Sequence, residues 1–245
     1  MSSEIVRALL YSGGAALLAV AGGAIAALRP PTARVRSYVQ HLAGGLIMAA
    51  VTVELLPDVM HRQRPVWAAL GFALGAAAML ALRQAAQAWG EGSEVSWRMI
   101  ATVLVDVTID GVILGVLLTA GQRASQRGAL VTIGLASELF ALGLATSSEI
   151  VGAGRSRIAG ISTGAAVGLG LFAGALLGAL LLSGLSGGLL EAFLAFGAAV
   201  FLYLVVEELL VEAHEVPETP LATTMFFVGF LVLLLIDMAF ARASA

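Results

Sequence analysis

The sequence contains no cysteine and no lysine. Without cysteine there can be no disulfide, no thiolate nucleophile and no sulfur ligand for a metal, which leaves oxygen donors and three histidines. Charged residues make up only 12% of the 245 residues, about half the share of ~25% that is usual in a soluble domain. Because lysine is absent, all 13 residues counted as Lys or Arg are arginines. The formal net charge of -3 provides no basic patch for nucleic acid. These shortages exclude a soluble enzyme and a nucleic-acid-binding protein.

Hydrophobic residues make up 60% of the chain and are arranged in long runs. A membrane-spanning helix needs about 20 such residues. The runs predict an all-α polytopic protein in which residues 1–245 form a single, multi-pass membrane domain, integral to the cell membrane (plasma or inner). The eight predicted spans cover residues 5–28, 38–60, 67–89, 99–120, 129–151, 158–182, 189–213 and 221–240.

Two features of this topology stay open. The first run, with Arg7 before it and Ala24-Ile25-Ala26 near its end, can also be read as a secretory signal with its cleavage site, although its length favours a span. The arginines divide seven to six between the two predicted faces. This split does not determine the orientation of the chain in the membrane.

The second and seventh predicted spans contain similar stretches, AGGLIMAAVTVELLPD from Ala43 and GAAVFLYLVVEELLVE from Gly197. Aligned without a gap, Glu54 matches Glu208 and Asp58 matches Glu212. The two spans are five apart, an odd number, so they cross the bilayer in opposite directions. The similarity predicts inverted three-helix halves, about 5–89 and about 158–240, around a central pair at about 99–151. The alternative is a chance likeness between helices rich in leucine and small residues.

Acidic residues inside the predicted spans are the most informative feature of the sequence. A carboxylate at the bilayer centre costs about 2.5–3.5 kcal/mol, and neither lysine nor a mid-span arginine is there to pair with it. The balancing charge must come from a bound cation or from protons. The acids are Glu54, Asp106, Asp110, Glu138, Glu207, Glu208 and Asp237.

Asp106 and Asp110 are four residues apart in the fourth span and therefore lie on one helix face, where they repel each other unless a cation lies between them. We predict an oxygen-rich site for a divalent ion that also includes Ser137 and Glu138 from the fifth span and Glu207 or Glu208 from the seventh. The alternative is a set of protonated acids that hydrogen-bond between helices. For Glu54, Glu149 and Asp237, near the predicted span ends, simple solvation is an equal alternative.

Two histidines fall on the same predicted face, His41 at the start of the second span and His214 at the end of the seventh. Three glutamates near His214 accompany them: Glu212, Glu215 and Glu218. The group predicts either a weak cation-binding mouth or, more simply, hydrated span ends.

These motifs resemble those of the ZIP (Zrt/Irt-like) family of divalent-metal transporters, of which the chain would be a divergent, prokaryotic-type member. The resemblance rests on E-L-L-P-D in the second span, D-x-x-x-D-G-V-I-L-G in the fourth, S-E-L-F-A in the fifth and A-A-V-F-L-Y-L-V-V-E-E-L-L-V-E-A-H-E in the seventh. It implies a 3+2+3 helix arrangement, a metal site between the fourth and fifth spans, and transport toward the cytoplasm. It also implies that both termini lie outside, so that His41 and His214 lie on the cytoplasmic face.

The chain departs from the family pattern at several positions, and Asp106 stands where the family has a histidine. Val107 and Ala141 stand where the family has metal ligands, and Ile109 and Phe140 replace prolines. Because valine and alanine cannot coordinate a metal, the sequence favours one metal site over two. Oxygen donors suit Mn²⁺, Mg²⁺, Ca²⁺ or Fe²⁺. Zn²⁺ is also a candidate, because most protein sites bind it more tightly than Mn²⁺.

The sequence thus predicts a transporter of Zn²⁺, Mn²⁺ or Fe²⁺, which is not an enzyme and carries no prosthetic group. Its expected partners are the lipid bilayer and the divalent cation, with no nucleic acid, and formation of a homodimer is left open. The alternative is a divergent relative that binds protons or another solute and no longer transports metal.

Overall fold

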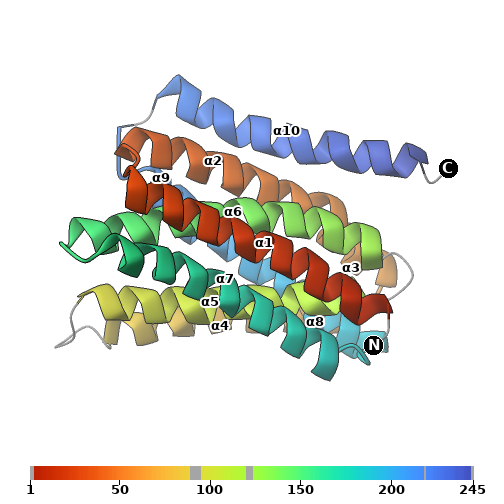
Figure 1. The fold of residues 1–245 in the computed structure, drawn as a ribbon. Helices are drawn as coiled ribbons and strands as arrows, with labels where there is room; N and C mark the ends of the chain where they lie inside the picture. Colours follow the sequence, from red (N-terminus) through yellow and green to blue (C-terminus); the bar gives the residue numbers. More distant parts are fainter. Residues whose placement is uncertain (1–2, 89–94, 120–123, 218, 244–245) are drawn as a thin grey trace.

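The computed structural model describes residues 3–88, 95–119, 124–217 and 219–243, and these ranges are helical apart from short connections (Figure 1). Two π-helical segments, η1 (Val51–Leu55) and η2 (Leu204–Leu209), interrupt α-helices. The α-helices are α1 (Ser3–Leu28), α2 (Ala33–Ala50), α3 (Leu56–Arg62), α4 (Pro65–Ala88), α5 (Val95–Thr119), α6 (Ala124–Gly152), α7 (Arg157–Leu181), α8 (Gly187–Tyr203), α9 (Leu210–Ala213) and α10 (Pro220–Ala243).

Within these described ranges, eight helical runs are long and apolar enough to cross a membrane, which confirms the predicted fold class. The second run joins α2, η1 and α3, and the seventh joins α8, η2 and α9. Several helices begin before the predicted apolar runs: α2 starts at Ala33 rather than residue 38, and α6 at Ala124 rather than 129. The first turns are polar, so hydropathy alone does not detect them.

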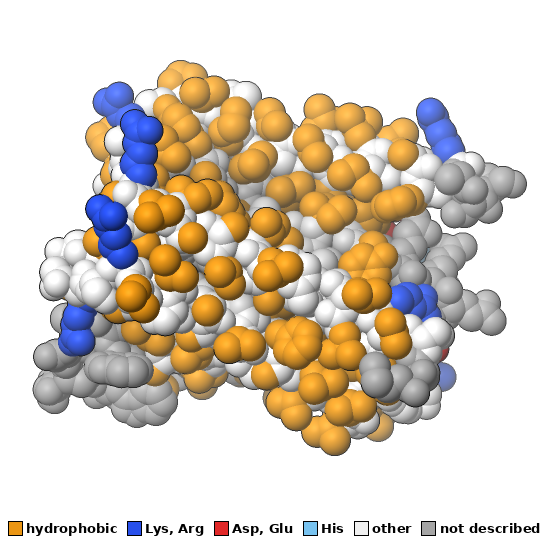
Figure 2. All heavy atoms as spheres, viewed as in Figure 1, with side chains coloured by type: hydrophobic (Ala, Val, Ile, Leu, Met, Phe, Trp, Pro, Cys, Tyr) orange, Lys and Arg blue, Asp and Glu red, His pale blue; other side chains and the backbone are white. Residues whose placement is uncertain are grey.

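Hydrophobic side chains cover the middle of the molecule, and arginines lie at its two ends (Figure 2). Leu10 in α1 and Phe227 in α10 are 70% and 65% exposed. Such a surface is unfavourable in water and favourable against lipid chains. The chain is therefore an integral, multi-pass membrane protein.

Helices α1, α5, α6 and α7 pack against one another, while α2 packs against α10 and α4 against α8. Glycines allow the closest approaches. A methyl group on Gly22 of α1 would lie 2.3 Å from the Phe140 carbonyl oxygen of α6, and one on Gly111 of α5 would lie 2.2 Å from the Leu171 carbonyl oxygen of α7. In lipid, where van der Waals packing drives helix association, such contacts fix how α5 and α6 lie relative to their neighbours.

The second and seventh spans follow the same register along the chain. α2 and α8 begin at Ala33 and Gly187, 154 residues apart. The π-helical segments fall at matching places, because η1 contains Glu54 and η2 contains Glu208. This register supports the prediction of inverted three-helix halves.

The number of spans also fixes the two faces of the molecule. Both termini lie at one end of the helix bundle, here called the terminal face, and the connection from α1 to α2 lies at the opposite end, the cavity face (Figure 1). Because five crossings separate a helix from its repeat partner, α1 and α7 run in opposite directions.

Candidate metal site

Three acids from the two central spans come together inside the bundle. Asp106 and Asp110 of α5 and Glu138 of α6 each offer a carboxylate oxygen, and these oxygens all lie within 4.8 Å of one another. The three side chains are 4%, 0% and 0% exposed. We call this group the carboxylate triad.

The packing of α5 explains how the triad forms. Asp106 and Asp110 are one turn apart and share a helix face. A different face of α5 carries Gly111 and Gly115, which lie directly against the backbone of α7. With that face held by α7, the two aspartates meet Glu138 on the neighbouring helix α6.

The triad is short of hydrogen bonds. Asp106 Oδ1 and both carboxylate oxygens of Asp110 and of Glu138 are buried and have no hydrogen-bond partner among the described residues. A buried acceptor without a partner costs about 1–3 kcal/mol, and a buried unpaired charge costs more. The arrangement is therefore stable only when a cation or protons balance it.

Glu208 extends the triad toward the seventh span. Its carboxyl group hydrogen-bonds that of Asp106, a contact that needs a proton on one of the two groups. Glu208 comes from η2, where the π-helical turn interrupts the normal helix register. Segments of π-helix occur frequently at functional sites. Four carboxylates from three spans thus face one another.

A cavity lined by Asp106 and Glu208 extends from this cluster toward the cavity face, whereas Asp110 and Glu138 are not among its lining residues. The inner part has a volume of about 400 Å³, and its acidic lining residues are Asp106, Glu149, Glu207, Glu208 and Glu212. The outer part, of about 270 Å³, is lined by Arg36, Gln40, Glu149, Glu212 and Glu215 among others. Because the two parts share Glu149 and Glu212, carboxylates follow the route from Asp106 to the end of α9.

Two of the predicted ligands make other contacts. The Ser137 hydroxyl donates a hydrogen bond of 2.6 Å to the Gly134 carbonyl oxygen of its own helix. Glu207 forms an ion pair of 2.7 Å with Arg83 of α4, and the two side chains are 41% and 52% exposed. The expectation that no arginine within a span pairs with these acids is therefore wrong for Glu207, because the long side chain of Arg83 reaches it across the surface.

The two histidines predicted to share a face are neighbours at the cavity face. Their rings lie 5.2 Å apart, and His41 is only 3% exposed. The Nδ1 atoms contact backbone oxygens, those of Ser37 for His41 and Leu210 for His214. Gln40 also hydrogen-bonds Glu212, an interaction that sequence patterns did not suggest. Glu218 lies outside the described residues.

Val107 and Ala141, which stand at family ligand positions, are 0% and 4% exposed. Val107 Cγ2 would lie 2.8 Å from a methyl group on Gly170 of α7, so Val107 packs against α7. Of the acids near the predicted span ends, Glu54 is buried, Asp237 is half-buried, and Glu149 is exposed and lines the cavity.

No protein-family model matches the chain, and no curated protein is similar to it. Membership of the ZIP family therefore stays a prediction from the motifs. What the fold and the site establish is coarser: a multi-pass membrane protein of eight spans with a buried acidic triad.

Proposed function

We propose that this protein is a divergent ZIP-type transporter that carries a divalent metal cation through the bundle. The observation that carries the proposal is the carboxylate triad, in which five buried oxygens have no partner in the described structure and Asp106 lines a cavity that leads to one face. A divalent cation neutralises most of this charge, for which the sequence offers no lysine.

Each acid has a distinct part in this proposal. Asp110 and Glu138, both fully buried, hold the ion deepest in the bundle. Asp106 lines the cavity and is hydrogen-bonded to Glu208, so this pair receives the ion from the cavity. Glu212 lines both parts of the cavity and attracts cations toward that pair.

The donor set also bears on which ion is carried. All four carboxylates supply oxygen, which suits Mn²⁺ or Fe²⁺, while Zn²⁺ competes through its higher general affinity. The ZIP resemblance places the termini outside, so the cavity would face the cytoplasm and the ion would leave the protein there. The proposal assigns the chain no catalysed reaction.

Uptake into proteoliposomes tests this function. We expect the wild-type protein to take up Mn²⁺, Fe²⁺ or Zn²⁺, and Asp110→Asn to abolish uptake because it removes a charged ligand while keeping the side-chain size. Asp237→Asn is the matched control, since it makes the same change in α10, outside the triad. Undiminished uptake by Asp110→Asn would overturn the site assignment.

The second candidate is a relative that binds protons or another solute. The apolar side chains of Val107 and Ala141 at family ligand positions favour it. It differs in one measurable outcome, because purified protein would then show no stabilisation by any of the three metals.

A further inference from the structure

One face of α2 carries three buried polar side chains close to the cavity face. Ser37, Gln40 and His41 have the i, i+3, i+4 spacing of a single helix face and are 3%, 5% and 3% exposed. A buried polar group without a hydrogen bond is costly, so each of them needs a partner. We call these three residues the α2 clasp, because they contact the end of α9.

Two members of the α2 clasp hold the helix end itself. The Ser37 hydroxyl donates a hydrogen bond of 2.7 Å to the Ala213 carbonyl oxygen, and the His41 ring lies edge-on to the His214 ring at 5.2 Å. The last carbonyl oxygens of a helix have no partner within that helix, and the Ser37 bond satisfies one of them. These two contacts fix where the seventh span ends.

The third member, Gln40, contacts a residue of the cavity. Its side-chain amide donates a hydrogen bond to Glu212 Oε2. Glu212 lines both the inner and the outer part of the cavity, and Gln40 lines the outer part. The bond therefore fixes a carboxylate at the place where the two parts meet. Because an amide is neutral, the bond orients this carboxylate without neutralising it.

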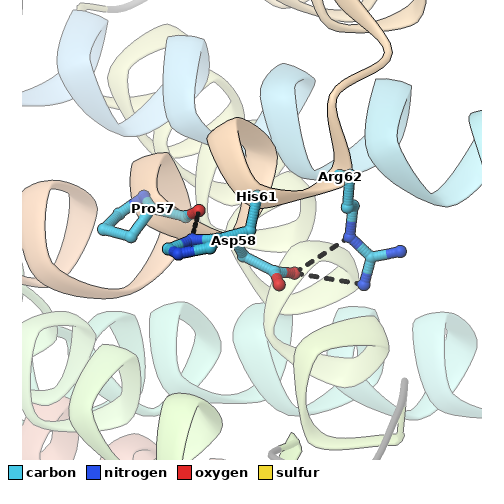
Figure 3. A network of polar contacts seen from close by, with 4 residues as sticks. All are labelled: Pro57, Asp58, His61 and Arg62. Carbon is cyan, nitrogen blue, oxygen red and sulfur yellow. Dashed lines mark hydrogen bonds and ion pairs between the residues drawn. The ribbon is translucent and has the colours of Figure 1, made fainter.

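The Asp58 carboxylate, which aligns with Glu212, is held in a different way (Figure 3). Arg62 of its own helix contacts it at 3.2 Å, and the adjacent His61 ring contacts the Pro57 carbonyl oxygen. An arginine compensates the charge of the acid that it holds. Glu212 forms no ion pair with any of the described residues. Its charge therefore stays available to a cation in the cavity.

Packing alone does not require an amide at this place. In the register of 154 residues between the second and seventh spans, Gln40 corresponds to Leu194 and His41 to Ala195, which are 3% and 2% exposed. Apolar side chains therefore fill the matching places in α8. The polar version lies at the face where the cavity opens, which favours a role in the cavity over a role in the fold.

We propose that Gln40 is a positioning residue that holds the Glu212 carboxylate at the junction of the two cavity parts, where it draws cations toward Asp106 and Glu208. This inference rests on the proposed transport function and concerns the cavity end of the ion's route. Clefts lined by charge of one sign concentrate the opposite ion and speed its association. The position of each carboxylate along the cleft then decides how far into the bundle that attraction reaches.

Loss of the amide would change where the charge of Glu212 lies. Arg36 lines the outer part of the cavity together with Glu212. A carboxylate released from Gln40 is drawn outward to this arginine, and an ion pair there withdraws its charge from the inner part. Association of a cation becomes slower, whereas dissociation depends on the carboxylate triad, which Gln40 does not contact. A change confined to the association rate is typical of charges at the rim of a site.

Stopped-flow mixing of purified protein in detergent with Mn²⁺ and a fluorescent metal indicator measures both rates. We expect Gln40→Leu, which copies the residue at the matching position of α8, to slow association by about three- to tenfold and to leave dissociation nearly unchanged. Glu212→Gln should slow association by at least as much, since such clefts raise association rates by about 10- to 1,000-fold. Adding Gln40→Leu to Glu212→Gln should have no further effect, because Gln40 acts through that carboxylate.

Two more variants separate positioning from folding. Gln40→Asn keeps a polar amide but is shorter by one methylene group, so it should slow association in the same way. Ser37→Ala is the matched control, because it removes another hydrogen bond between α2 and α9 that does not involve Glu212. It should lower the unfolding temperature and leave both rates unchanged.

The outcomes separate this inference from the proposed function. Equal slowing by Ser37→Ala, or a further loss in the double variant, would indicate general loosening of α9 and overturn the role of Gln40. Unchanged association in both Gln40→Leu and Gln40→Asn would also overturn it, and either result leaves the proposed function standing. A wild-type protein that binds none of Mn²⁺, Fe²⁺ and Zn²⁺ would instead overturn metal transport, and this inference with it.

Discussion

Asp110→Asn should separate a metal site from a structural cluster of acids, because the two predict opposite effects on the metal-free protein. If Asp110 and its neighbours are ionised with oxygens 4.8 Å apart, each pair repels by about 3.5 kcal/mol at an effective dielectric constant of about 20. Removing one charge relieves that repulsion. We therefore expect metal-free Asp110→Asn to be at least as stable as the wild type.

The metal-bound protein should respond in the other direction. At a free Mn²⁺ concentration of 100 times Kd, binding stabilises the wild type by about 2.7 kcal/mol. Groups that merely support a ligand change metal affinity by about 10–100-fold, so loss of a ligand should weaken it by about 100-fold or more. At the same Mn²⁺ concentration the remaining stabilisation is then about 0.4 kcal/mol or less.

Thermal unfolding of purified protein in detergent, with and without Mn²⁺, measures both quantities, and Asp237→Asn serves as the control with an unchanged response to metal. The reasoning would be refuted if Asp110→Asn lowered the stability of the metal-free protein and kept the full response to Mn²⁺. That result would identify the triad as hydrogen-bonded acids that hold helices together.

Two further pairs of substitutions test how the site is built. Glu208→Gln should lower Mn²⁺ uptake by about tenfold or more, because it removes a charge from the cavity end of the site. Its control, Glu207→Gln, breaks only an exposed ion pair. It should therefore change stability by no more than about 1 kcal/mol and leave uptake nearly unchanged. Gly111→Ala places a methyl group 2.2 Å from a carbonyl oxygen of α7. It should lower the stability by about 1–3 kcal/mol and weaken Mn²⁺ binding. Its control, Gly14→Ala, places a methyl group with no atom within 4 Å and should be neutral or stabilising.

The spans were predictable because hydropathy and length decide whether a helix crosses a bilayer. The match between the second and seventh spans was also visible, since the aligned stretch has no insertion between Ala43 and Asp58. The π-helical turns could not be predicted from the sequence. They arise from a change of hydrogen-bond register in the backbone, and no residue type in either stretch requires that change.

The adjacent acids Glu207 and Glu208 show where sequence reasoning ends. Neighbours in a helix point about 100° apart, so only one of them can face the bundle, and both have the same chemistry. The structure turns Glu208 toward Asp106 and Glu207 toward Arg83. Ser137 presents a similar difficulty, because a helical hydroxyl can serve a ligand or return to its own backbone, and here it bonds to Gly134.

The position of Arg83 helps to explain why the negative charge of the carboxylate triad can be balanced by a mobile ion. Its guanidinium is tied to Glu207 at the surface, and the described residues that line the inner cavity include no basic side chain. A fixed cation among Asp106, Asp110 and Glu138 would neutralise them permanently and compete with any metal. Because Arg83 is paired with Glu207 and the described lining of the inner cavity adds no basic side chain, the charge deficit at the centre is left to an ion that can enter and leave.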